Sequence, residues 1–324
     1  MDDSSQVGEA RRFAAALCEE QAFNEVQQGR AGIVVNELGN NLVKYARNGK
    51  LLFRKLNVNY GTGLEILAID SGPGMDASRA LRDGYTTGST PGTGLGAVRR
   101  QSDVFDLYSQ AETGTVILSQ IFATDEAKNL ERTFDEGAVC SPLKSEPVSG
   151  DDWATSARDG EISLLVADGL GHGLLANKAA EEALSAFRAN LASPLDHRLQ
   201  LIHGRLKSTR GAAVFLAHVR PSAVDFAGVG NIRAVIVNAS GTKTLISQNG
   251  TAGLQMRSAK ILTQTWNGDG YLILHSDGVT SRWDLARYPG ILTRHPAILA
   301  GLIYRDALRG SDDATVVVIA RSRK

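Results

Sequence analysis

The sequence predicts a two-domain α/β protein, and three observations support this fold class. The chain has 324 residues, which is an ordinary length for two domains. Hydrophobic residues make up 43% of it and charged residues 22%, a balance that provides enough apolar material for two cores. Near residue 130 the pattern changes from mixed helices and strands to a succession of strands.

The bulk composition excludes several classes of partner. The 35 basic and 35 acidic residues give zero formal charge, so no overall field favours nucleic acid or an anionic membrane. No apolar run approaches the ~20 residues of a membrane-spanning helix. The opening "MDDSSQ" is unlike a secretory signal, and Cys18 and Cys140 are too far apart in the chain to suggest a disulfide framework. We therefore expect a cytoplasmic protein with no nucleic-acid or membrane partner.

Residues 1–122 predict an α/β domain. Two helices are expected first, over 8–29 and 31–47, with Gly29 ending the first. The later predicted elements are strands over 51–60 and 63–70, a short helix over 76–84, a glycine-rich loop over 86–96 and a hairpin over 103–122.

Residues 134–324 predict a β-sandwich flanked by helices. The charged stretch 123–133 lacks an apolar period and is predicted to be the linker between the domains. Strand-like runs such as "EISLLVAD" and "ATVVVIA" follow it, with helices expected near 175–191, 194–207 and 293–307. The strands do not alternate regularly with helices, so we expect an antiparallel sandwich rather than βαβ units.

A set of polar and glycine residues in the first domain predicts a nucleotide site. Glu37 and Asn41 are four residues apart on a predicted helix and share one face. Asp70 ends a strand and opens "DSGPG", and "GTGLG" leads into a helix. Its glycines, Gly92, Gly94 and Gly96, would let backbone N–H groups approach phosphate oxygens. No Walker sequence is present. Each piece alone also fits a plain turn, loop or solvated helix face.

The chemistry of these residue types suits phosphoryl transfer. A carboxylate such as Asp70 can accept a hydrogen bond from an adenine amino group, and Asn41 offers an amide oxygen to Mg²⁺. Glu37 could take the proton from a hydroxyl that attacks the γ-phosphate.

Residues 1–122 resemble the anti-sigma-factor type of serine/threonine kinase in the GHKL ATPase superfamily, especially the RsbT-like kinases. "NELGNNLVKYA" resembles the N-box, "DSGPGM" the first glycine box and "GYTTGSTPGTGLGAVRR" the ATP lid with the second glycine box. The resemblance implies a Bergerat α/β sandwich that binds ATP and Mg²⁺. It also implies that Glu37 is the catalytic base, Asn41 the magnesium ligand and Asp70 the adenine contact. Gly72 and Gly74 would shape the pocket wall.

Four short aspartate motifs divide the second domain: "VSGDDW", "VADGLGHG", "HSDGVTSRWD" and "GSDDATVVV". Strand ends can gather such carboxylates at one edge of a sheet, where mutual repulsion raises their pKa values. Hard divalent cations relieve that repulsion, and two of them could activate a water for attack on a phosphoester. A single Asp-Gly pair is more often a hairpin turn; four such motifs together favour a metal site.

Residues 134–321 resemble PPM-type metal-dependent phosphatases of the SpoIIE and RsbX-like branch, through the same four motifs. The resemblance implies two Mn²⁺ or Mg²⁺ ions held by Asp151, Asp168, Gly169, Asp277 and Asp312. Two alternatives stay open, since "GDD" also offers Asp152 and "SDD" also offers Asp313. No basic residue matches the phosphate-binding residue of eukaryotic members, for which Lys144 is only a candidate.

The two resemblances together predict a bifunctional switch enzyme. The first domain would phosphorylate, and the second dephosphorylate, Ser or Thr of a STAS-domain anti-sigma-factor antagonist or a stressosome-like protein. The alternative is a phosphatase whose ATP-binding domain serves only as a partner-binding module. Kinase relatives often form homodimers, so a homodimer is an expected state that no apolar stripe in the sequence decides.

Overall fold

The structure is a computed structural model that describes the chain except for residues 2, 57–61, 77–93, 257–259 and 324. The chain divides into two compact units. The first contains Met1–Glu131 with the distant segment Ala286–Arg294, and the second contains Arg132–Leu285 with His295–Lys324. All but the first residue of the helix predicted over 76–84, and most of the loop over 86–96, lie outside the described residues.

The first unit begins with two helices, α1 (Ser4–Glu20) and α2 (Glu25–Tyr45). The prediction that Gly29 ends a helix is wrong, because the chain breaks earlier. Asn24 caps α2 through a reciprocal capping box with Gln27, which satisfies two N–H groups at the helix start. Gly29 lies inside α2, where a single glycine is tolerated at a cost of about 1 kcal/mol.

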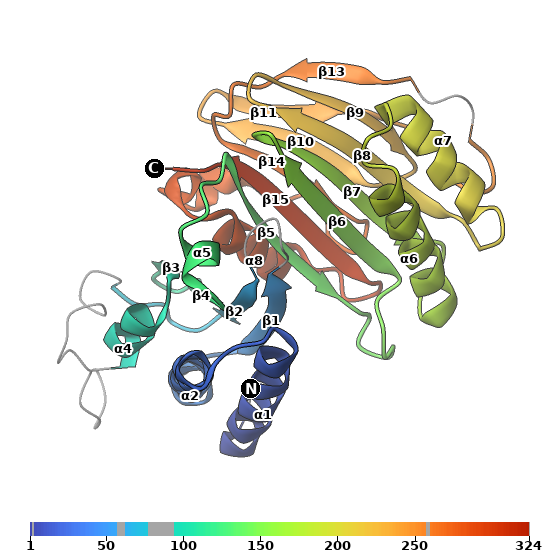
Figure 1. Ribbon diagram of the computed structural model, residues 1–324. Helices are drawn as coiled ribbons and strands as arrows, with labels where there is room; N and C mark the ends of the chain where they lie inside the picture. Colours follow the sequence, from blue (N-terminus) through green and yellow to red (C-terminus); the bar gives the residue numbers. More distant parts are fainter. Residues whose placement is uncertain (2, 57–61, 77–93, 257–259, 324) are drawn as a thin grey trace. The chain divides into compact units, whose positions relative to one another are not determined.

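A four-stranded antiparallel sheet supports these helices (Figure 1). Its strands are β1 (Lys50–Leu56), β2 (Gly63–Asp70), β3 (Val104–Gln110) and β4 (Gly114–Phe122), in the order β1-β2-β4-β3. The core between the layers contains Val34, Val35 and Leu38 of α2 with Leu64 and Ile66 of β2. Two short helices complete this part of the chain, α4 (Gly94–Gln101) and α5 (Asp125–Lys128).

The segment Ala286–Arg294 packs on β3 within the first unit. The ring of Tyr288 lies edge-on to that of Tyr108 with centroids 6.2 Å apart, and Arg294 Nη1 is 3.1 Å from Asp106 Oδ1. The chain therefore contributes to this unit from two distant parts of the sequence. Two turns of 3₁₀-helix lie in or beside the segment, η2 (Leu285–Arg287) and η3 (Ile291–Thr293).

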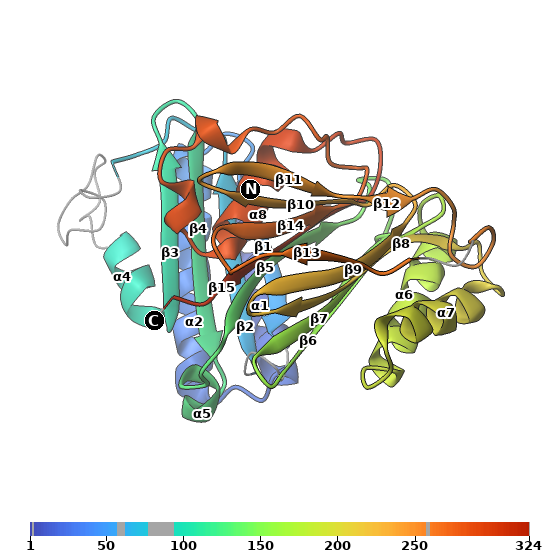
Figure 2. The same cartoon turned by 90° about the horizontal axis from the view of Figure 1, so that it is seen from above.

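The second unit is a sandwich of two sheets (Figure 2). One sheet has the order β11-β10-β14-β15-β5 and the other β12-β9-β8-β7-β6, with β13 also paired to β9. The strands are β5 (Phe134–Ser141), β6 (Asp151–Arg158), β7 (Glu161–Gly169), β8 (Ala212–Arg220), β9 (Ala223–Val229), β10 (Arg233–Asn238), β11 (Gly241–Leu245), β12 (Ser247–Gln248), β13 (Leu262–Thr265), β14 (Tyr271–His275) and β15 (Ala314–Arg321). All described pairings are antiparallel except that of β12 with β9.

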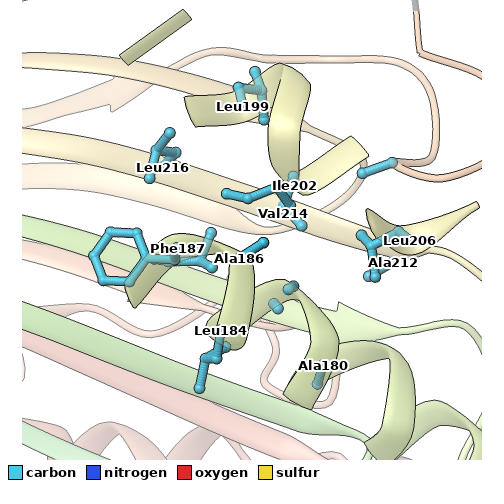
Figure 3. Packing of buried hydrophobic residues seen from close by; sticks show 14 of the residues in the cluster. Ala180, Leu184, Ala186, Phe187, Leu199, Ile202, Leu206, Ala212, Val214 and Leu216 are labelled. Carbon is cyan, nitrogen blue, oxygen red and sulfur yellow. The ribbon is translucent and has the colours of Figure 1, made fainter. Parts of the chain in front are cut away.

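Helices cover the outer faces of this sandwich. Helices α6 (Leu174–Ala189) and α7 (Leu195–Leu206) pack on the sheet that contains β7 and β8, and α8 (Pro296–Ala307) packs on β5 and β15. Figure 3 shows Phe187, Leu199 and Ile202 of the helices meeting Val214 and Leu216 of β8. This packing supports β6 and β7, at whose ends two of the four aspartate motifs lie. Among the described residues, no helix is long and apolar enough to cross a membrane.

Candidate functional site

Helix α2 brings two of the predicted nucleotide-site residues onto one surface. Glu37 and Asn41 are both half-buried, and Leu38 and Leu42 beside them enter the core. Residues four apart on a helix lie above one another. The Glu37 carboxyl group and the Asn41 amide therefore leave the helix on the same side.

Glu37 lies against the start of α4. A Cβ added to Gly94 would be 2.7 Å from Glu37 Oε2, so the absence of a side chain lets the helix start approach the carboxylate. Helix starts carry unpaired N–H groups and partial positive charge. The sequence predicted a loop over 94–96, but α4 begins at Gly94 because Leu95 and Val98 are buried in the core beside α2. Gly96 is buried in this helix, and Gly92 lies outside the described residues.

Asp70 lies beside the C-terminal end of α2. Its Oδ1 accepts a 2.6 Å hydrogen bond from the backbone N–H of Gly72. A Cβ at Gly72 would be 3.0 Å from the carbonyl oxygen of Tyr45, so the turn after β2 packs closely on the end of α2. Gly74 has φ +69° and would clash with the Gln110 carbonyl if it carried a side chain. The glycines thus fix this turn, about 12 Å from Glu37 along α2 at 1.5 Å per residue.

Two aspartates of the second unit face one another across paired strands. Asp151 is the first residue of β6 and lies opposite Asp168, near the end of β7. Asp277 follows β14, and Asp312 precedes β15, which pairs with β14. Ser276 Oγ donates a 2.6 Å hydrogen bond to Asp151 Oδ2 and so joins the ends of the two sheets.

The pKa shifts show that these carboxylates interact. Loss of solvent raises the pKa of Asp168 to about 9, and the charges of Asp151, Asp277 and Asp312 add to the shift. Burial raises the pKa of Asp151 to about 7, against the hydrogen bond from Ser276. Burial also raises the pKa of Asp312, with a further contribution from Asp277. The fold therefore gathers four separated aspartates into one acidic cluster, consisting of Asp151, Asp168, Asp277 and Asp312.

The neighbouring aspartates Asp152 and Asp313 have other surroundings. The charges that act on Asp152 are those of Arg188 and Glu181 on α6, and its Oδ1 accepts from the N–H of Trp153. Asp313 is 2% exposed, and its two oxygens accept hydrogen bonds from the N–H groups of Leu143 and Gly150. Asp313 therefore holds loops together, although its charge also reaches the cluster.

Glycines permit close packing around the acidic cluster. A Cβ at Gly169 would clash with the backbone carbonyl of Ala176 in α6. A Cβ at Gly150 would be 2.8 Å from Asp313 Oδ2. The position of Gly169 is thus set by a close approach of helix to strand, which leaves no room for a side chain.

Several polar residues at the cluster were not predicted from the sequence. Asn231 Nδ2 donates a 2.7 Å hydrogen bond to Asp277 Oδ2, and Ser276 directly precedes Asp277. His172, treated above only as part of a motif, has Nδ1 2.6 Å from Glu146 Oε1. Asn231 follows β9 in "VGNIR". An amide residue between two strands was the one feature of the sequence that could have indicated a role at the cluster.

The donor set of the acidic cluster suits hard cations. Within the described residues, no three His, Cys, Asp or Glu side chains converge as a ready-formed metal cage. No described basic group or hydrogen-bond donor is paired with the Asp168 carboxylate, and burial together with the like charges of its neighbours raises its pKa. Carboxylates that repel one another in this way are stabilised by Mg²⁺ or Mn²⁺. The residues present therefore fit divalent ions through their charge and chemistry.

Two family profiles match the chain, one in its first part and one in its second, and the second also spans Ala286–Arg294, which the structure places in the first unit. The profile of the histidine kinase-like ATPase domain matches residues 2–120. The profile of Stage II sporulation protein E (SpoIIE) matches residues 158–322, about half of the chain. The chain belongs to the SpoIIE family. We refer to the second compact unit as the SpoIIE unit and to the first as the ATPase unit.

Two curated relatives match one unit each. Serine/threonine-protein kinase RsbT of Bacillus subtilis (strain 168) is 35% identical over 109 residues, 33% of this chain and 82% of that protein. Phosphoserine phosphatase RsbX of the same organism is 24% identical over 139 residues, 42% of this chain and 70% of that protein. The predicted fusion of an RsbT-like kinase domain with a PPM-type SpoIIE domain is confirmed.

Solved structures resemble the SpoIIE unit. A structure described under "The bacterial stressosome: a modular system that has been adapted to control secondary messenger signaling" has a TM-score of 0.53 and 30% identity, covering 57% of this chain and 98% of that one. RsbX in complex with magnesium has a TM-score of 0.50 and 20% identity, covering 60% of this chain and 98% of that one. The predicted fold class is confirmed: a GHKL-like α/β unit followed by a PPM-like sandwich of sheets and helices.

Proposed function

We propose that this chain is a bifunctional regulatory enzyme that phosphorylates Ser or Thr of partner proteins with its ATPase unit and removes such phosphates with its SpoIIE unit. The acidic cluster around Asp168 carries the proposal, because it gathers four carboxylates from separate segments, and burial together with the charges of the other three raises the pKa of Asp168 to about 9. Similarity to a kinase and to a phosphoserine phosphatase supports the pairing of the two activities.

In the SpoIIE unit, Asp151, Asp168, Asp277, Asp312 and the Gly169 carbonyl would hold two Mg²⁺ or Mn²⁺ ions. Bound there, the ions would supply a water of lowered pKa and neutralise the phosphoryl oxygens. The protein's contribution is to fix the carboxylates. Ser276 holds Asp151, and Asn231 holds Asp277. Water then adds to phosphorus, the bond to the seryl oxygen breaks, and the seryl oxygen takes a proton.

In the ATPase unit, Glu37 would act as the general base. It would accept the proton of a Ser or Thr hydroxyl as that oxygen bonds to the γ-phosphorus and the bond to ADP breaks. Asn41 would hold Mg²⁺ and Asp70 the adenine amino group, with Gly72 and Gly74 forming the wall of the adenine pocket. Support comes from the contact of Glu37 with the start of α4, where N–H groups can receive phosphate oxygens.

The proposed partner is a STAS-domain protein of a partner-switching or stressosome-like pathway. The names of the matched kinase and of the stressosome structure support this class. Two opposed activities on one chain would hydrolyse ATP without effect if they shared a phosphosite at the same time. The two units are therefore proposed to act on different phosphosites or at different times.

Single-site variants of the full chain test the assignment. Glu37→Ala should abolish transfer of label from γ-labelled ATP to the protein substrate and spare dephosphorylation, and Asp277→Ala should do the reverse. Glu19→Ala on α1 and Asp196→Ala on α7, both exposed carboxylates, are the matched controls. Retention of both activities by both variants would contradict the proposal. Dephosphorylation without any label transfer by the wild type would leave the ATPase unit as a partner-binding module.

A further inference from the structure

Arg210 lies at the same end of the SpoIIE unit as Asp168. It belongs to the connection between α7, which ends at Leu206, and β8, which begins at Ala212. Ala212 is paired with Gly169, and the N–H of Leu170 donates a 3.0 Å hydrogen bond to the carbonyl of Gly211. The connection is thus fixed to the strand end that carries the acidic cluster.

The guanidinium of Arg210 lies over the glycine loop that follows Asp168. Gly171 has φ +87°, and a Cβ there would be 3.2 Å from Arg210 Nη1. Arg210 is exposed, and no carboxylate in the described part of the chain forms an ion pair with it. By contrast, Arg205 on α7 is paired with Glu182. An unneutralised cation is therefore held beside the loop rather than in a salt bridge.

Arg210 is also not the counter-ion of the aspartates. No hydrogen bond or ion pair in the described part of the chain joins the Arg210 guanidinium to Asp168 or Asp312, and the guanidinium lies instead against the loop at Gly171. The guanidinium thus stands at the edge of the cluster with its donors available. A planar guanidinium binds two oxygens of one phosphate, a geometry that an ammonium group lacks.

We propose that Arg210 is a phosphate-binding residue of the SpoIIE unit, where it receives oxygens of the phosphoester dianion that the acidic cluster and its cations hydrolyse. This inference rests on the phosphatase activity proposed above. Leu170 and Leu254, which are 42% and 55% exposed, lie beside Gly211, the residue that follows Arg210. Their apolar surface lowers the local dielectric and strengthens the contact between cation and dianion.

Inorganic phosphate is the probe, used as a competitive inhibitor of p-nitrophenyl phosphate hydrolysis by the full chain with Mn²⁺. Arg210→Ala should raise the inhibition constant of phosphate and the KM at least about tenfold, and Arg210→Lys should recover part of the loss. Lys207→Ala, which removes an exposed charge from the end of α7, is the matched control and should match the wild type. Mn²⁺ affinity by calorimetry and the melting temperature should be unchanged in all variants.

The outcomes separate this inference from the proposed function. If the wild type hydrolyses the ester and Arg210→Ala has the same phosphate inhibition constant, Arg210 is an ordinary solvated surface residue and the inference is overturned. A loss of Mn²⁺ affinity in Arg210→Ala that accounts for its kinetic change would also overturn it. If the wild type neither binds Mn²⁺ nor hydrolyses the ester, the proposed function fails, and the inference fails with it.

Discussion

Asp151 lies directly opposite Asp168 in the antiparallel pair formed by β6 and β7. Like charges at opposed positions of a strand pair destabilise it, and here Asp277 and Asp312 add to the repulsion. Burial elsewhere in the SpoIIE unit must offset this cost when no cation is bound. Metal binding and folding stability are therefore coupled in this unit. The stability of the metal-free protein should also depend on pH.

When a chelator keeps divalent ions away, the free energy of unfolding of the SpoIIE unit should fall as the pH rises. The pKa values of Asp151 and Asp168 are raised to about 7 and about 9, whereas an unfolded Asp titrates near ~3.9. The folded state therefore binds more protons, so the stabilising contribution is complete below about pH 4 and is lost as the pH rises through about 7 and 9. Thermal unfolding from pH 5.5 to about 9 measures this, and Asp168→Asn should flatten the profile.

Mn²⁺ should reverse the loss at the alkaline end. At a free concentration of 100 times its Kd, a ligand that binds only the folded state adds about 2.7 kcal/mol. The gain should be absent in Asp168→Asn, because the variant lacks a carboxylate of the cluster. A melting temperature in chelator that rises from pH 5.5 to about 9 would contradict the assigned shifts.

Substitution of Gly169 should destabilise the SpoIIE unit. An added methyl group would meet the carbonyl of Ala176 in α6, and overpacking of this kind costs about 1–3 kcal/mol or more. Gly204→Ala is the control, since nothing lies within 4 Å of a Cβ at this position in the last turn of α7. It should stabilise by about 0.5–1 kcal/mol. Urea unfolding of both variants is the measurement. Equal urea midpoints for the Gly169 and Gly204 variants would contradict the close approach of α6 to Gly169.

The sequence predicted those parts of the fold that depend on local pattern. The apolar run over 63–70 coincides with β2, and the helix expected near 194–207 coincides closely with α7. Strand β6 was missed because "DDWATSAR" is polar and its inner face is lined by small residues such as Ala154. The break between α1 and α2 was misplaced, although Asn24 and Gln27 form a readable capping signal.

The candidate site was predictable in its residue types but not in its supporting contacts. Four aspartates at strand ends could be grouped from the motifs alone. The hydrogen bond from Ser276 to Asp151 spans 125 positions, and that from Asn231 to Asp277 spans 46. The first pair arises from the stacking of the two sheets and the second from the pairing of β10 with β14, so neither could be predicted from local spacing. The same holds for Arg210, which reaches the loop at Gly171 only through the pairing of β7 with β8.

Asn231 should contribute to metal affinity through Asp277. Partners that orient a metal ligand typically change affinity by 10–100-fold when they are removed, so Asn231→Ala should weaken Mn²⁺ binding by about that factor. Asn238→Ala is the control, because the side chain of Asn238 bonds only the exposed turn at Ser240. Calorimetric titration with Mn²⁺ is the measurement. Equal Kd values for the two variants would show that the hydrogen bond to Asp277 has no role in binding.

Replacement of Gly94 should lower phosphoryl transfer without lowering the stability of the fold. Gly94 is the first residue of α4, where glycine costs a helix less than in its interior, so Gly94→Ala should change the stability of α4 little. Its Cβ would be 2.7 Å from Glu37 Oε2, which forces the carboxylate to move. We therefore expect label transfer from ATP to fall at least about tenfold, the usual scale for a displaced general base.

A double variant isolates the contact between these two residues. If Gly94→Ala acts by displacing Glu37, its effect should vanish in a Glu37→Ala background, because residues that act as a unit are not additive. Gly32→Ala in α2, where nothing lies within 4 Å of an added Cβ, is the control for a glycine replaced in a helix. A Gly94→Ala variant with undiminished label transfer would remove the Glu37 contact from the proposed mechanism. Dephosphorylation by each variant should equal that of the wild type, since that activity is proposed for the SpoIIE unit.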